Sequence, residues 1–209
     1  MIFDELKEAL KTHRTTVTEG WKEFMKVRDA LTEKYSPKYS EIEIAKAKES
    51  YDNAVWESEK EVRTIMQETL DKLKEKISGV ASKPIDPDFV PTLAVLEKME
   101  NPTKIEVDQI VGKFKTNYVC YRAICGAVGG INAGYCPINL EDILKRCDQV
   151  EDKVNRALKG DIDSYNYRVL ADSVGLDVFA DFFEKFFEGY FDDITEELEK
   201  EKKNKNFVK

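Results

Sequence analysis

The chain has 209 residues, of which 42% are hydrophobic and 35% are charged, with a net charge of −8 and a pI near 5.0. This composition favours long solvated helices over a compact α/β enzyme. The acidic balance disfavours nucleic-acid binding, because such a chain gains nothing from counterion release. The sequence contains no run of about 18 apolar residues, so no membrane span is predicted. The charged N-terminus lacks an apolar signal core, so secretion is not expected.

Residues 2–34 follow a heptad pattern, which predicts a long helix with one apolar seam. The seam positions are Phe3, Leu6, Leu10, His13, Val17, Gly20, Phe24, Val27 and Leu31. A lone histidine on such a seam is typical of a satisfied core residue or of a polar group that sets the register. A pH switch is the alternative reading of His13.

A second long helix is predicted over residues 41–78. Pro37 interrupts the first pattern, Ser40 and Glu43 match a capping box, and Gly79 is expected to end the helix. Two long helices joined by a short turn indicate an antiparallel, coiled-coil-like hairpin over residues 1–78.

A turn centred near residue 37 predicts which positions face each other across the hairpin. It brings Gly20 close to Ala54–Trp56, where the glycine would make room for Trp56, and it brings His13 close to Glu61. Pairing of the seam with another copy of the chain fits the same pattern, so the sequence leaves both alternatives open.

Residues 79–92 hold three prolines and a glycine and are predicted to form a linker or elbow. A smaller helical domain is predicted over 93–209. Its short helices are expected to begin at Asp86 or Asp88 and at Thr103, followed by a helix over 139–159 and a last helix over 176–202. Asn139 is the predicted N-cap of the helix over 139–159.

Residues 113–136, KFKTNYVCYRAICGAVGGINAGYC, concentrate three cysteines and four glycines. Cys120 and Cys125 are five positions apart, which puts them on different helix faces and does not match the ligand spacing of a zinc site. The glycines follow a helix rather than a strand and lack the Lys-Ser/Thr of a phosphate loop. The run is therefore interpreted as a packed helix with its turn, and no catalytic, cofactor-binding or metal-binding residue is predicted.

The last helix carries an unusually wide aromatic surface. Its aromatic residues are Phe179, Phe182, Phe183, Phe186, Phe187, Tyr190 and Phe191. One stripe of them can pack on the chain's own core. The excess width suggests a second contact with another subunit or a partner protein, and core packing alone is the alternative.

Residues 102–125 read PTKIEVDQIVGKFKTNYVCYRAIC. The stretch Lys113-Phe114-Lys115-Thr116-Asn117-Tyr118, followed by Tyr121-Arg122-Ala123-Ile124, resembles a family of helical proteins from the head-gene clusters of tailed phages. The order of a long charged N-terminal helical region, a linker and a short helical module is similar as well. The resemblance implies a virion-assembly or capsid-associated role and supplies no catalytic residues.

Together these observations predict an all-α protein with a long N-terminal hairpin and a smaller C-terminal helical domain. The expected function is that of a non-enzymatic phage structural or scaffolding-like protein. Its expected partners are other copies of itself and capsid or other virion proteins, with neither nucleic acid nor membrane as a partner and no cofactor. Its expected location is the cytoplasm of a bacterial host or the virion. An acidic inhibitor or adaptor that binds a basic host protein is the alternative, and an enzyme using Cys120 or Cys125 is the third hypothesis.

Overall fold

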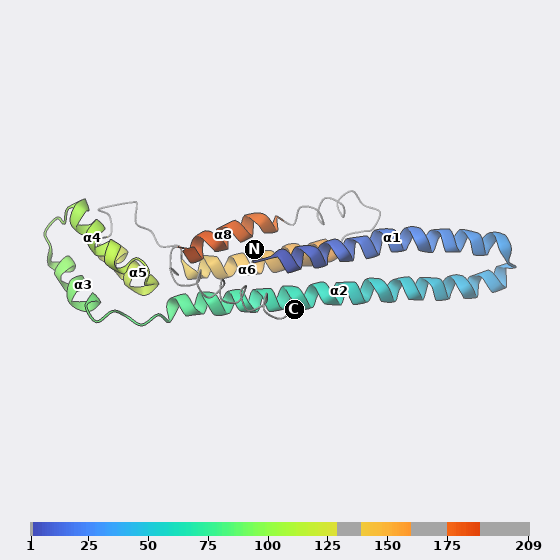
Figure 1. Cartoon of the computed structure of the whole chain (residues 1–209), viewed down its shortest axis with the longest axis horizontal. Coiled ribbons are helices and arrows are strands. Elements are labelled where there is room, and N and C mark those ends of the chain that lie inside the picture. The colour runs from blue at the N-terminus through green and yellow to red at the C-terminus, as the bar shows by residue number, and fades with distance from the viewer. Residues whose placement is uncertain (1, 129–138, 160–174, 189–209) are drawn as a thin grey trace, which may run out of the picture. The chain divides into compact units, whose positions relative to one another are not determined.

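The computed structural model describes residues 2–128, 139–159 and 175–188. In these ranges the chain forms seven helices and no strand, which confirms the predicted all-α class. The helices are α1 (Asp4–Lys34), α2 (Pro37–Ala81), α3 (Phe89–Lys98), α4 (Lys104–Phe114), α5 (Tyr118–Ala127), α6 (Leu140–Leu158) and α8 (Leu176–Glu188) (Figure 1). Each helix in this part of the chain is too short or too polar to span a lipid bilayer.

The chain divides into two compact units. One comprises Met1–Leu73 and Arg146–Ala180, and the other comprises Lys74–Lys145 and Asp181–Lys209. The region 93–209, predicted as a single C-terminal domain, is thus shared between the units.

In the first unit, α1 and the first part of α2 run antiparallel and side by side (Figure 1). The predicted hairpin is present, and its seam pairs within the chain. The seam is buried at Phe3, Leu6, Leu10, His13, Val17 and Phe24. It opens towards the turn, where Val27 is 37% exposed and Leu31 is half-buried.

Gly20 faces Tyr51, and the predicted role of Trp56 is wrong. A Cβ atom built on Gly20 would stand 3.1 Å from two ring carbons of Tyr51. The Tyr51 ring is buried and packs 6.3 Å from Phe24, measured between ring centroids. Trp56 is 58% exposed, so it takes no part in the seam. The missing side chain of Gly20 therefore admits the tyrosine ring.

The limits of α2 also differ from the prediction. The helix begins at Pro37, because proline suits a first helical position where an N–H group would have no partner. The Ser36 carbonyl accepts the Ser40 N–H at 3.0 Å, and the Ser40 hydroxyl donates to the Pro37 carbonyl, so Ser40 lies inside the helix and is not its cap. The helix continues through Gly79 to Ala81, since the buried Val80 keeps the last turn packed.

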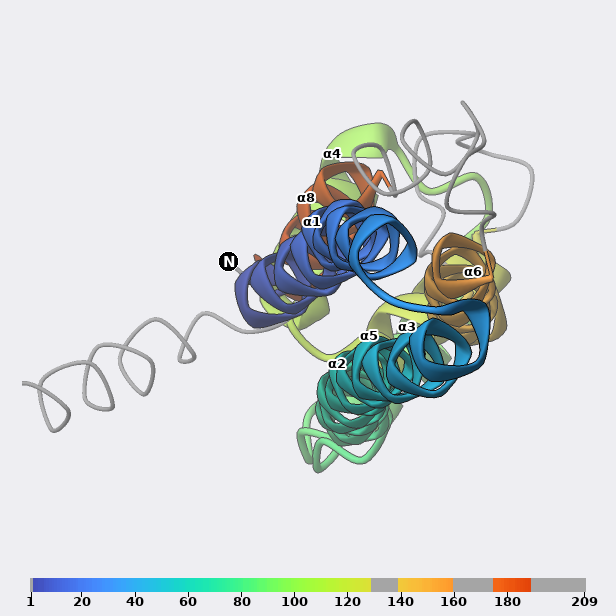
Figure 2. The same ribbon diagram turned by 90° about the vertical axis from the view of Figure 1, so that its right-hand side faces the viewer.

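Helices α6 and α8 also contribute to the first unit. Arg63 of α2 donates to the Asn155 side chain of α6 at 2.7 Å, and Figure 2 shows α6 alongside the hairpin. The Lys153 ammonium of α6 lies 5.3 Å from the ring centroid of Phe179 in α8. Lys7 of α1 forms an ion pair with Asp177 at the start of α8. The hairpin therefore packs against two helices that lie far from it in the sequence.

In the second unit, α3, α4 and α5 enclose a small core. Its buried members are Phe89, Leu96, Val107, Val111, Phe114, Cys120, Ile124 and Val128. As predicted, α4 starts at Thr103, and the structure adds a capping box there, in which Glu106 accepts the Thr103 N–H at 2.8 Å. A separate cap at Asn117, which accepts the Cys120 N–H at 3.2 Å, starts α5. Helices α4 and α5 are therefore two separate elements that meet at a corner.

The remaining predicted elements are partly confirmed. Helix α6 begins after Asn139, whose side chain accepts the Glu141 N–H at 3.2 Å. Leu144, predicted on the apolar stripe of this helix, is 39% exposed. The linker is shorter than predicted, since only residues 82–88 separate α2 from α3. The part of the last helix predicted beyond Glu188, including Tyr190 and Phe191, lies outside the described residues.

Candidate interaction surface

His13 is a buried histidine beside half-buried polar side chains in the first unit. Its side chain faces α2, is 4% exposed, and places Nδ1 2.8 Å from the Ser58 hydroxyl. The Ser58 hydroxyl also lies 2.8 Å from the Val55 carbonyl, to which it donates. Because a hydroxyl has one proton, both contacts are hydrogen bonds only if His13 Nδ1 carries the hydrogen. The partner of His13 is therefore Ser58, not the predicted Glu61.

An ion pair lies beside this histidine. Arg63 donates through Nε and Nη2 to Glu59 Oε1 at 2.9 and 2.6 Å, while its Nη1 reaches Asn155. Burial lowers the pKa of His13, with an opposing contribution from the Glu59 carboxylate and a supporting one from Arg63. The imidazole is thus neutral at pH 7, and these polar side chains fix the register of α1 against α2 and of α2 against α6.

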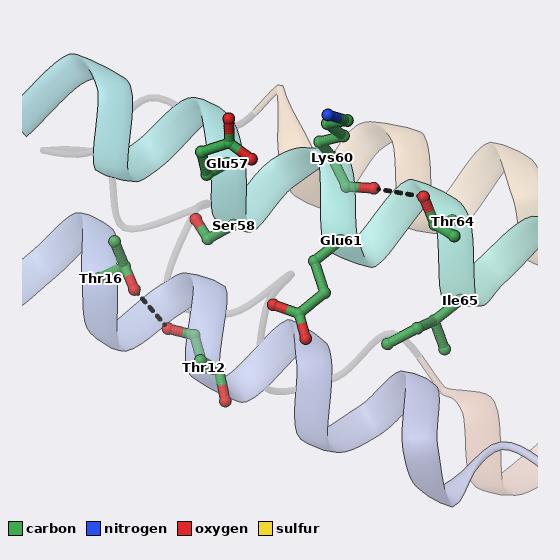
Figure 3. Close-up of a pocket in the computed structure, with 8 residues that line it drawn as sticks. All are labelled: Thr12, Thr16, Glu57, Ser58, Lys60, Glu61, Thr64 and Ile65. Carbon is green, nitrogen blue, oxygen red and sulfur yellow. Dashed lines mark hydrogen bonds between the residues drawn. The ribbon is translucent and has the colours of Figure 1, made fainter.

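A shallow groove of about 510 Å³ lies between α1 and α2 (Figure 3). Its lining is Thr12, Thr16, Glu57, Ser58, Lys60, Glu61, Thr64 and Ile65. The hydroxyls of Thr16 and Thr64 donate to carbonyls of their own helices, at 3.1 and 3.0 Å. The Ser58 hydroxyl likewise donates to a carbonyl of its own helix, that of Val55, at 2.8 Å.

The thiols behave as small core residues. Cys120 and Cys147 are fully buried, whereas Cys125 is half-buried on another side of α5, as the spacing predicted. Burial raises the pKa of the Cys120 thiol, which keeps it protonated at neutral pH. Among the described residues, no cluster of three or more His, Cys, Asp or Glu side chains is placed to hold a metal ion. Cys136 lies outside these residues.

The aromatic residues of α8 are mostly interior. Phe179, Phe183, Phe186 and Phe187 are all less than 9% exposed, and Phe182 is half-buried. The sequence left core packing and a partner contact as alternatives for this surface. Core packing accounts for the four buried rings, and among the described residues of this surface only Phe182 is left partly exposed.

One surface open to a partner is the end of the hairpin, residues 25–50, here called the hairpin tip. Within this fully described segment, Ser40 is the only buried residue. Its exposed large hydrophobic residues are Val27, Tyr35, Tyr39 and Ile42. The Tyr35 and Tyr39 rings pack on each other at the turn, 4.9 Å apart between centroids. The tip is therefore a two-helix segment without a core of its own.

Helix α3 presents a second apolar surface. Phe89 and Leu96 face the small core of the second unit, whereas Val90 and Val95, five positions apart, are 65% and 60% exposed on the two flanks of the helix. Ala94 is exposed beside them. Because these exposed apolar side chains lie away from the small core, the outer face of α3 is a second candidate contact surface.

The fold and these surfaces define the class of the protein, an all-α protein built on a long antiparallel hairpin whose tip is open. No protein-family model, curated protein or solved structure matches the chain.

Proposed function

We propose that this chain is a non-enzymatic structural or assembly protein of a tailed phage, scaffolding-like or capsid-associated, which acts through helix-mediated self-association and protein contacts. The observation that carries the proposal is the hairpin tip. Most of the stability of a helix in a protein comes from packing of its apolar face, and the tip packs no large side chain out of solvent. An additional layer of helices supplied by another chain completes such a segment.

The composition of the tip supports contact with protein rather than with nucleic acid or membrane. Residues 25–50 carry six basic and five acidic side chains, interspersed along both helices. Neither a polyanion nor an anionic lipid surface is attracted by such a balance. Helix–helix contacts, by contrast, are commonly flanked by charges of both signs.

The phage assignment is supported by the resemblance over residues 102–125, whose polar positions have a structural role. Lys113 bonds to Asp88 at 2.9 Å, and the Asn117 side chain donates to the Pro84 carbonyl at 2.9 Å. These two residues hold the segment between α2 and α3 against the helix corner. The exposed outer face of α3, next to this segment, is the surface we propose for a capsid or other virion protein.

Two measurements test the proposal. Light scattering on the purified chain is expected to give a mass above the 24.1 kDa of one copy, rising with concentration. A strict monomer at the highest attainable concentration contradicts self-association.

The second measurement is affinity capture by the tagged chain from cells producing phage heads. It is expected to recover a head protein, and substitution of Val90 and Val95 by Glu is expected to abolish that capture. Recovery of a basic host protein in a salt-sensitive complex, without head proteins, supports the acidic inhibitor or adaptor instead.

A further inference from the structure

One row of residues on α1 is complementary to the same row of a second copy of the chain. Glu23, Val27, Ala30 and Lys34 are spaced i, i+4, i+7 and i+11, which places them on one face of the helix. The row is accessible, with a Glu23 side chain 70% exposed, Val27 37% exposed, and both Ala30 and Lys34 exposed. It carries an acid at one end, a base at the other, and two apolar side chains between them.

An antiparallel copy of this row complements it. Placing the two rows antiparallel, centred between residues 28 and 29, puts Glu23 opposite Lys34 of the second copy and Val27 opposite Ala30. A parallel arrangement instead puts each charge opposite its own kind. The small side chain of Ala30 lets the two helices approach closely.

The neighbouring row repeats the same symmetry. Lys22, Lys26, Asp29 and Glu33 have the same spacing, one position earlier along the helix. The side chains of Lys22, Lys26 and Asp29 are 64%, 76% and 63% exposed. An antiparallel pairing of this row centred between residues 27 and 28 puts Lys22 opposite Glu33 and Lys26 opposite Asp29. That register lies two residues from the register of the first row, so the second row shows the same antiparallel preference and the register itself rests on the first row.

The charge of the rest of the hairpin favours the same arrangement. The chain carries a net charge of −8, and residues 51–73 alone hold six acidic and three basic side chains. The tip, with six basic and five acidic residues, is close to neutral. Two hairpins that overlap antiparallel at their tips keep their acidic segments at opposite ends, whereas parallel hairpins bring them together.

We propose that a second copy of this chain docks antiparallel on α1 at the hairpin tip, through the face formed by Glu23, Val27, Ala30 and Lys34. The proposal rests on the self-association proposed above and names its surface and register. The contact extends over residues 22–34, about 20 Å of helix, so it is a small interface. Such interfaces are weak and concentration-dependent when they act singly, and they suit an assembly protein that must also dissociate.

Charge reversal tests the register directly. Glu23→Lys and Lys34→Glu each place like charges opposite one another at two symmetry-related points, and each is expected to raise the dimer Kd at least about tenfold. The double variant restores opposite charges and is expected to dimerise within about threefold of wild type. An equimolar mixture of the two single variants is expected to form heterodimers by native mass spectrometry, although neither dimerises alone.

Two matched control variants separate the register from a general effect of net charge. Glu8→Lys and Lys11→Glu make the same charge changes on exposed positions of α1 away from the tip and are expected to leave the Kd unchanged. Lys34→Glu also weakens the C-terminal end of α1 through the helix dipole. The double variant carries the same change, so its recovery excludes fraying as the cause.

The outcomes distinguish this inference from the proposed function. A wild-type dimer that is indifferent to both single reversals overturns the antiparallel register and leaves self-association standing. Single variants that lose dimerisation without recovery in the double variant or in the mixture overturn the register as well. A wild-type chain that stays monomeric overturns both.

Discussion

Acidification is expected to loosen the hairpin through His13. The imidazole is 4% exposed, bonds to the Ser58 hydroxyl at 2.8 Å, and has its pKa lowered by burial. The unfolded chain therefore binds a proton more readily than the folded chain, starting from the ordinary value of 6.5. Stability due to His13 is complete above that value, falls as the pH drops below it, and stops falling below the folded-state pKa.

The size of this effect follows from proton linkage. One proton taken up only on unfolding changes the free energy of unfolding by at most about 1.4 kcal/mol per pH unit. A drop from about pH 7.5 to about pH 5.5 extends one unit below the unfolded-state value, so the loss due to His13 is at most about 1.4 kcal/mol.

Urea denaturation followed by far-UV circular dichroism measures this loss when the wild type is compared with His13→Leu. Leucine suits the seam, and Ser58 keeps its bond to the Val55 carbonyl. Contributions common to both proteins cancel, so the pH dependence of the difference between them reports on His13. A difference that stays constant with pH, or a wild type that gains stability relative to the variant in acid, refutes the reasoning.

Other substitutions test the packing and the caps. Gly112→Ala adds a Cβ that meets no atom within 4 Å and is expected to raise the free energy of unfolding by roughly 0.5–1 kcal/mol. Gly20→Ala adds a Cβ that meets the buried Tyr51 ring at 3.1 Å, so in the same urea titration its gain in unfolding free energy is expected to be about 1 kcal/mol smaller. Equal gains contradict the close contact. Thr103→Ala removes a capping box and is expected to cost about 1 kcal/mol by thermal unfolding, with no loss counting against the cap. In the native protein, a thiol reagent is expected to modify Cys125 faster than Cys120, and equal rates contradict the burial of Cys120.

The features that the sequence predicted well are encoded in neighbouring residues. The helix start at Thr103 and the N-cap at Asn139 need only side chains within three positions, whereas the capping box predicted at Ser40 and Glu43 is absent because α2 begins earlier, at Pro37. The heptad seam of α1 likewise depends on spacing along one helix, and its buried positions from Phe3 to Phe24 are confirmed.

The pairing across the hairpin was missed for one physical reason. Pro37 opens α2 instead of preceding it, so the turn is shorter than expected and every facing residue of α2 comes about one helical turn earlier. Tyr51 therefore stands where Ala54 was expected, and Ser58 where Glu61 was expected. The choice between proline before a helix and proline at its first position depends on tertiary packing that local sequence does not contain.

The candidate surface was also only partly predictable. The width of the aromatic stripe on α8 could not reveal whether the chain itself or a partner covers it, because both bury the same side chains. The exposure of the tip could not be predicted either, since Val27 continues the heptad pattern of the buried residues before it. Only the exposure of the tip in the folded chain separates the two parts of the seam.

Hydrogen exchange as a function of protein concentration tests the central claim most directly, namely that the hairpin tip is completed by a second copy. At about 1 µM the amides of residues 25–50 are expected to exchange quickly, and at about 200 µM they are expected to gain protection while residues 51–73 do not change. Exchange that is independent of concentration at the tip, or protection gained at the outer face of α3 instead, contradicts the account.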